Sequence, residues 1–76
     1  MLLKRNEVLK MTGFSKATLY RRIDEALFPP SFTTGGKSVA FLADEVTQII
    51  QAYSLQLPNE ELKNIVQQLI EARSQL

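Results

Sequence analysis

The chain has 76 residues, a mass of 8.6 kDa and a formal net charge of +1, which is the size of one small domain. Cysteine and histidine are both absent, which excludes disulfides, thiolate metal sites and histidine-based catalysis. Because no disulfide can support the fold, packing must hold it. Hydrophobic residues make up 45% of the sequence, which is ordinary for a globular chain. No apolar run approaches the ~20 residues of a membrane span and no signal peptide is recognisable, so we expect a cytosolic protein.

The charges are distributed unevenly along the chain. Residues 1–41 contain seven basic and three acidic residues, whereas residues 42–76 contain two basic and five acidic residues. Such a distribution favours one surface that binds a polyanion and one end of the molecule that avoids it.

The first expected helix is short and covers about residues 7–11. Asn6 is its expected N-cap, because the side-chain oxygen of asparagine accepts a hydrogen bond from an otherwise free backbone amide. Gly13 then supplies the unusual backbone angles of a tight turn. Val8 and Leu9 are the expected core residues of this helix.

The second expected helix starts after Ser15, a favourable N-cap, and runs to about Ala26, because Pro29 cannot continue a helix. Helical spacing predicts a buried stripe, which consists of Leu19, Ile23, Ala26 and Leu27. The opposite side of this helix presents Ala17, Thr18, Arg21 and Asp24.

The rest of the chain predicts a hairpin and two further helices. Residues 31–41 are typical of a β-hairpin, with Gly35-Gly36 as a two-residue turn that permits positive φ at both positions. A third helix is expected over about residues 43–54, with an apolar stripe of Leu42, Val46, Ile49, Ile50 and Tyr53. After Pro58, Asn59 can cap a fourth, amphipathic helix that extends to about residue 74.

Two short helices joined by residues 12–15 are typical of a helix-turn-helix, whose second helix lies in the major groove of DNA. The hairpin that follows makes the arrangement a winged helix. We therefore expect a mainly α protein with a small β-hairpin, a winged helix-turn-helix with an additional C-terminal helix. Residues 1–57 would form the DNA-binding domain. Residues 58–76 would form an amphipathic helix that either packs on the core or makes a dimer.

The candidate DNA-contacting residues lie on the second helix and on the hairpin. They are Ser15, Lys16, Ala17, Thr18, Tyr20, Arg21, Arg22, Lys37 and Ser38. Arg21, Thr18 and Ala17 are the expected base-reading residues, since they share the outward side of the helix. Among the others, Lys16, Tyr20, Arg22 and Lys37 are expected to hold phosphates.

Structural alternatives remain open for some of these residues. Arg22 can pair with Asp24 or Glu25, and Tyr20 can pack partly into the core. The remaining cations near the amino terminus, Lys4, Arg5 and Lys10, are interpreted as a solvated surface rather than as DNA contacts.

The string from Arg5 to Ile23 (RNEVLKMTGFSKATLYRRI), followed by Phe28-Pro29, residues 35–41 (GGKSVAF) and Glu45-Val46, resembles the AlpA family of prophage regulators. That family is similar to excisionases and to the DNA-binding domain of MerR-type activators. The resemblance covers about residues 3–53. The family commonly has arginine where Lys37 stands and tryptophan where Phe41 stands, and lysine lacks the bidentate geometry of arginine. The resemblance implies a bacterial or phage-borne transcription factor, often acting on integrase or excision genes.

We therefore expect a sequence-specific regulator that binds double-stranded DNA in the bacterial nucleoid, with no catalytic activity, cofactor, metal or membrane partner. Two other functions remain open. One is an excisionase-like architectural factor that assists a recombinase, and the other is a protein-interaction adaptor that uses the fourth helix. A second copy of the chain, bound through residues 59–75, is the other partner considered.

Overall fold

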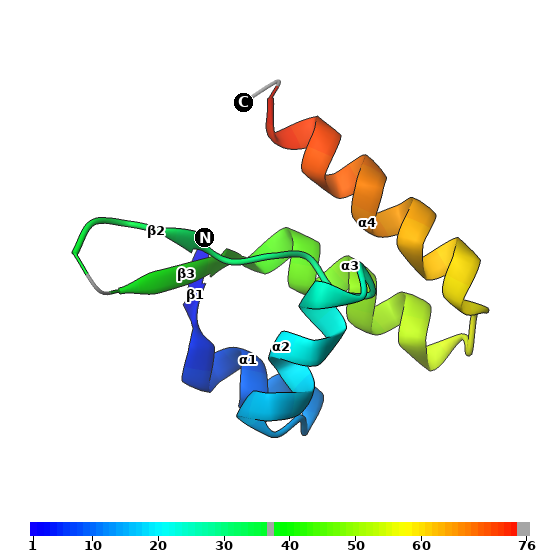
Figure 1. Cartoon of the computed structure of the whole chain (residues 1–76), viewed down its shortest axis with the longest axis horizontal. Helices are drawn as coiled ribbons and strands as arrows, with labels where there is room; N and C mark the ends of the chain where they lie inside the picture. The colour runs from blue at the N-terminus through cyan, green and yellow to red at the C-terminus, as the bar shows by residue number, and fades with distance from the viewer. Residues whose placement is uncertain (37, 75–76) are drawn as a thin grey trace.

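The computed structural model describes residues 1–36 and 38–74, which form four helices and a three-stranded antiparallel sheet (Figure 1). In chain order the elements are β1 (Leu2–Lys4), α1 (Arg5–Thr12), α2 (Lys16–Asp24), β2 (Phe32–Thr33), β3 (Val39–Leu42), α3 (Ala43–Ser54) and α4 (Asn59–Arg73). This order is that of a winged helix-turn-helix followed by one more helix, so the predicted fold class is confirmed.

The sheet contains one strand that the sequence did not predict. β3 is its central strand and pairs antiparallel with β1 on one side and β2 on the other. The register places Lys4 opposite Ala40. The start of α1 therefore lies beside the base of the hairpin.

The connection between β2 and β3 is longer than predicted. The Thr34 amide donates a hydrogen bond to the Ser38 carbonyl, with 3.4 Å between nitrogen and oxygen. Three residues, 35–37, therefore separate the paired positions, and the predicted two-residue turn is wrong. Gly35 and Gly36 both have positive φ, at +113° and +62°, as the turn chemistry predicted.

α1 begins earlier than expected, and Asn6 is not its cap. Lys4 occupies the N-cap position, and Glu7 Oε1 accepts a hydrogen bond from the Lys4 amide at 3.0 Å. The reason is β1, which delivers an extended chain to Lys4 and leaves Asn6 inside the first helical turn. At the other end Gly13 has φ +75° and its amide bonds to the Leu9 carbonyl, as predicted.

α2 ends at Asp24 rather than near Ala26, before it reaches the proline that was expected to stop it. Ala26 has φ +60° and is exposed, so its assignment to the buried stripe is wrong. The amides of Ala26 and Leu27 donate to the carbonyls of Ile23 and Arg22, at 3.1 and 2.8 Å. This pair of bonds is a Schellman motif, which ends a helix through one left-handed residue.

Phe28 lies at the centre of the core and is fully buried. Its ring meets Phe14 and Phe41 at steep interplanar angles, each with a centroid separation of 6.2 Å. Phe14 belongs to the turn between α1 and α2, and Phe41 belongs to β3. Phe41 is also fully buried, and the remaining fully buried large side chains are Val8, Leu19, Pro29, Val46, Ile49 and Val66.

α4 packs along α3 of the same chain (Figure 1). Leu62 and Val66 are buried there, so the apolar side of α4 contributes to the core. Asn59 is the first residue of this helix, and Pro58 takes the N-cap position, so the predicted asparagine cap is wrong by one residue.

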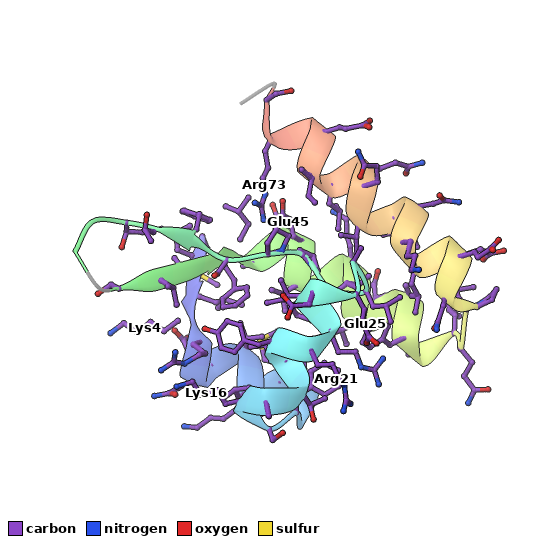
Figure 2. All side chains as sticks on the ribbon, viewed as in Figure 1. Lys4, Lys16, Arg21, Glu25, Glu45 and Arg73 are labelled. Atoms are coloured by element: carbon purple, nitrogen blue, oxygen red, sulfur yellow. The ribbon has the colours of Figure 1, made fainter. Side chains whose placement is uncertain are left out.

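Glu45 is a buried carboxylate at the start of α3, and Arg73 at the end of α4 pairs with it (Figure 2). The Arg73 Nε donates to Glu45 Oε2 at 2.7 Å, and this hydrogen bonding with Glu45 raises the pKa of the Arg73 guanidinium. The Nη2 of Arg73 also donates to the Pro30 carbonyl at 2.8 Å, and the guanidinium lies 5.9 Å from the centroid of Phe32. Arg73 thus connects α3 to the segment that enters the hairpin.

Two kinds of feature are missing from the part of the chain that the structure describes. None of its helices has the length and the apolar character that crossing a membrane requires. Its acidic side chains also form no cluster of three or more that could hold a metal ion.

Ala26→Gly is expected to raise the free energy of unfolding by about 0.5–1 kcal/mol. Glycine removes the cost of a left-handed L-residue, and the greater freedom of the unfolded chain offsets only part of that gain. Urea denaturation followed by circular dichroism measures the change. Ala17→Gly, on the exposed side of α2, is the control and should lower stability by about 1 kcal/mol. Destabilisation by both variants would contradict the observed helix end.

Arg73→Met is expected to lower the free energy of unfolding by about 1–3 kcal/mol, because it leaves the buried Glu45 carboxylate without its charged partner. The double variant Glu45→Gln/Arg73→Met should recover part of this loss in the same urea experiment. Lys63→Met, at an exposed position of α4, is the control and should shift stability by less than about 0.5 kcal/mol. If Arg73→Met and Lys63→Met lowered the free energy of unfolding equally, the ion pair would contribute nothing to stability.

Candidate nucleic-acid interface

The residues of α2 differ in their surroundings according to the side of the helix on which they lie. Successive residues are about 100° apart, so Leu19 and Ile23 lie toward the core and Arg21 lies on the opposite side. Lys16 and Ala17 are exposed like Arg21, whereas Thr18 is partly buried. Figure 2 shows Arg21 directed away from the helix into solvent. The predicted outward side of α2 is therefore accessible to a ligand.

Two hydroxyl groups form the N-terminal cap of α2. The Ser15 hydroxyl accepts a hydrogen bond from the Thr18 amide at 3.1 Å and donates to the Thr18 hydroxyl at 3.0 Å. The predicted N-cap is confirmed, and it holds the exposed beginning of the helix in a fixed conformation.

Tyr20 lies on the flank of α2 that faces the start of α1. Arg5 Nη1 donates a hydrogen bond to the Tyr20 hydroxyl at 3.3 Å, and both side chains are partly buried. Arg5 was interpreted from the sequence as part of a solvated surface. Its contact joins residues 15 positions apart, and no local pattern signals such a pairing.

Arg22 lies on the opposite flank and packs on aromatic rings of its own chain. Its guanidinium carbon is 5.4 Å from the centroid of Phe14 and 5.5 Å from that of Tyr53. Tyr53 in turn donates its hydroxyl to the Leu27 carbonyl, and burial raises the pKa of the Tyr53 phenol despite the nearby Arg22. Among the described residues, neither Asp24 nor Glu25 forms a salt bridge with Arg22.

The hairpin supplies one described member of the predicted set. Ser38 is exposed and immediately precedes β3, while Lys37 lies outside the described residues. The hairpin extends away from the helices in Figure 1. In Figure 2, Lys4 and Lys16 lie toward the same side of the molecule as the hairpin.

A polar hollow opens between the start of α1 and the hairpin. It is lined by Lys4, Arg5, Asn6, Ser38 and Val39. Sequence reasoning missed this grouping, because it depends on the pairing of β1 with β3.

These elements define a winged helix-turn-helix protein with an exposed, cationic second helix. The family model described as "Prophage CP4-57 regulatory protein (AlpA)" matches residues 1–54, and the chain belongs to this AlpA family. The resemblance found in the sequence is thereby confirmed. α4 lies outside the matched residues.

The chain is also similar to a phage protein described only as "Uncharacterized protein ORF88", from Enterobacteria phage P4. The two are 46% identical over 41 residues, which cover 54% of this chain. The matched part spans about half of the relative, 47% of its length. No solved structure matches the chain.

Arg22→Ala is expected to lower the free energy of unfolding by about 1 kcal/mol, because the guanidinium loses its packing on two aromatic rings. Arg21→Ala is the matched control one residue earlier, and it should change stability by less than about 0.5 kcal/mol. Urea denaturation of both variants provides the comparison. Equal effects would contradict the different surroundings of the two arginines.

Proposed function

We propose that the chain is a sequence-specific transcriptional regulator that binds double-stranded DNA, with α2 in the major groove and the β2–β3 hairpin against the backbone. The observation that carries this proposal is the exposed Arg21 on the outward side of the second helix of a helix-turn-helix. Arginine is the commonest side chain that reads guanine, because its two parallel N–H groups match the guanine O6 and N7 atoms.

The other predicted residues take distinct roles in this docking mode. Thr18 and Ala17 share the groove-facing side of α2 with Arg21, and the alanine methyl can contact a thymine methyl. The phosphate-contacting group comprises Ser15, Lys16, Arg22, Lys37 and Ser38. Tyr20 supports this group from the flank of α2, where its hydroxyl accepts a hydrogen bond from Arg5. Within this group Arg22 also packs on the rings of Phe14 and Tyr53, so it combines a structural role with its proposed phosphate contact.

The family description supports a regulatory role and names no reaction. A prophage regulator of this kind would act on DNA in the bacterial nucleoid, within the cytoplasm. DNA binding through lysine and arginine releases counterions, so the affinity must fall steeply as the salt concentration rises.

Arg21→Ala is expected to weaken binding to a cognate duplex by about 1–3 kcal/mol and to relax the preference at one base pair. The cognate duplex is obtained by selecting a random pool with the wild-type protein, and fluorescence anisotropy measures affinity for it and for single-base variants. Lys63→Ala on α4 is the control and should bind like wild type. Unchanged affinity and base preference in Arg21→Ala would refute the assignment of the reading helix.

A further inference from the structure

Ser38 is distant in sequence from Lys4 and Arg5, yet all three residues line one hollow of the surface. β1 brings them together: Lys4 pairs opposite Ala40, which is two residues from Ser38 along the chain. We call the surface formed by Lys4, Arg5, Asn6, Ser38 and Val39 the Lys4–Arg5 hollow. It joins the start of the helix-turn-helix to the base of the hairpin.

Arg5 is held in this hollow by a specific contact. Its Nη1 donates to the Tyr20 hydroxyl at 3.3 Å, and the side chain is partly buried. A guanidinium carries five N–H donors in a rigid fork, and the bond to Tyr20 uses one of them. The side chain is therefore both oriented and equipped to bond to an anion.

The charge of the hollow is positive. Lys4 and Arg5 both contribute to it, and the Lys4 side chain is exposed. One acidic residue lies beside the hollow: Glu7 lines an adjoining cavity that shares Lys4, Ser38 and Val39, and its Oε1 accepts a hydrogen bond from the Lys4 amide. Asn6 and Ser38 add neutral polar groups. This composition suits a phosphate, for which arginine and lysine are the usual ligands.

The position of the hollow indicates which phosphate it can meet. A single sugar–phosphate strand separates the major groove of DNA from the adjacent minor groove. If α2 enters the major groove and the hairpin lies at the next groove, that strand must pass between them. Figure 2 shows Lys4 on the side of the hairpin, between the hairpin and Lys16 at the start of α2.

We propose that the Lys4–Arg5 hollow binds one phosphate of the DNA strand that runs between the groove occupied by α2 and the hairpin. This inference rests on the proposed function and adds contacts to it. Lys4 and Arg5 provide the charge, and Ser38 provides a hydroxyl. Tyr20 acts as a positioning residue for Arg5 rather than as a direct phosphate ligand.

Two measurements test the proposal, both on the duplex selected by the wild-type protein. In the first, Lys4→Ala and Arg5→Gln each reduce the slope of log affinity against log salt by about one, and weaken all sequences about tenfold at 0.1 M salt. In the second, single methylphosphonate linkages replace the phosphates one at a time along both strands. One linkage should weaken the wild-type protein and leave Arg5→Gln unaffected, which couples that phosphate to Arg5.

Tyr20→Phe keeps the ring and removes the hydroxyl, so it should lose part of the coupling between Arg5 and that phosphate. The double variant Tyr20→Phe/Arg5→Gln should then bind no more weakly than Arg5→Gln. A loss of affinity in Tyr20→Phe that adds fully to that of Arg5→Gln would overturn the positioning role.

Lys63→Ala provides the matched control for a lysine outside the interface. If Arg21→Ala relaxes base preference while Lys4→Ala and Arg5→Gln behave like Lys63→Ala, the hollow is refuted and the reading helix stands. If the wild-type protein selects no duplex at all, the proposed function itself fails. Because Lys4 is exposed, its variant tests the hollow without disturbing the fold.

Discussion

The position of Phe28 between the rings of Phe14 and Phe41 is the constraint on which the surface formed by α2 and the hairpin depends. Phe14 fixes the turn that starts α2, and Phe41 fixes the strand that leaves the hairpin, and both rings contact Phe28. A fully buried ring has no free volume in which to shift, because protein interiors are packed to the density of organic crystals. The spacing between α2 and the hairpin is therefore set by packing, before any ligand is bound. The proposed docking, with α2 in one DNA groove and the hairpin at the next, requires such a fixed spacing.

Neighbouring cations on this framework serve different purposes. Arg21 and Arg22 are adjacent in sequence, yet a rotation of about 100° leaves Arg21 in solvent and places Arg22 over Phe14 and Tyr53. Arg22 therefore connects α2 to the end of α3, in addition to the phosphate contact proposed for it. On the other flank the Tyr20 hydroxyl accepts a hydrogen bond from Arg5. The contacts of Arg22 with aromatic rings and of Arg5 with Tyr20 therefore hold α2 in place on both flanks.

Local chemistry made part of this structure predictable. Ser15 and Gly13 bound the turn of the helix-turn-helix as expected, because caps and left-handed glycines depend on neighbouring residues alone. α3 also covers Ala43–Ser54, the range that its periodicity predicted.

The features that were missed depend on distant parts of the chain. β1 has three residues and exists only because β3 pairs with it, and that pairing creates the hollow beside Lys4. The hydrogen bond between Glu45 and Arg73 joins residues 28 positions apart, so no local sequence pattern signals it. The end of α2 was misplaced for a different reason, since alanine at a left-handed position gives no signal in the sequence.

α4 extends the molecule beyond the family match and still affects the candidate interface. Leu62 and Val66 cover α3, and Arg73 bonds to the Pro30 carbonyl at the entrance to the hairpin. The apolar side of α4 is therefore used within its own chain, and its exposed residues are polar apart from Ile70 and Ala72. Stable dimers bury apolar surface at the centre of their interface, and the described residues of α4 offer little of it. The same packing gives α4 a role within its own chain, because it holds the base of the hairpin against α3.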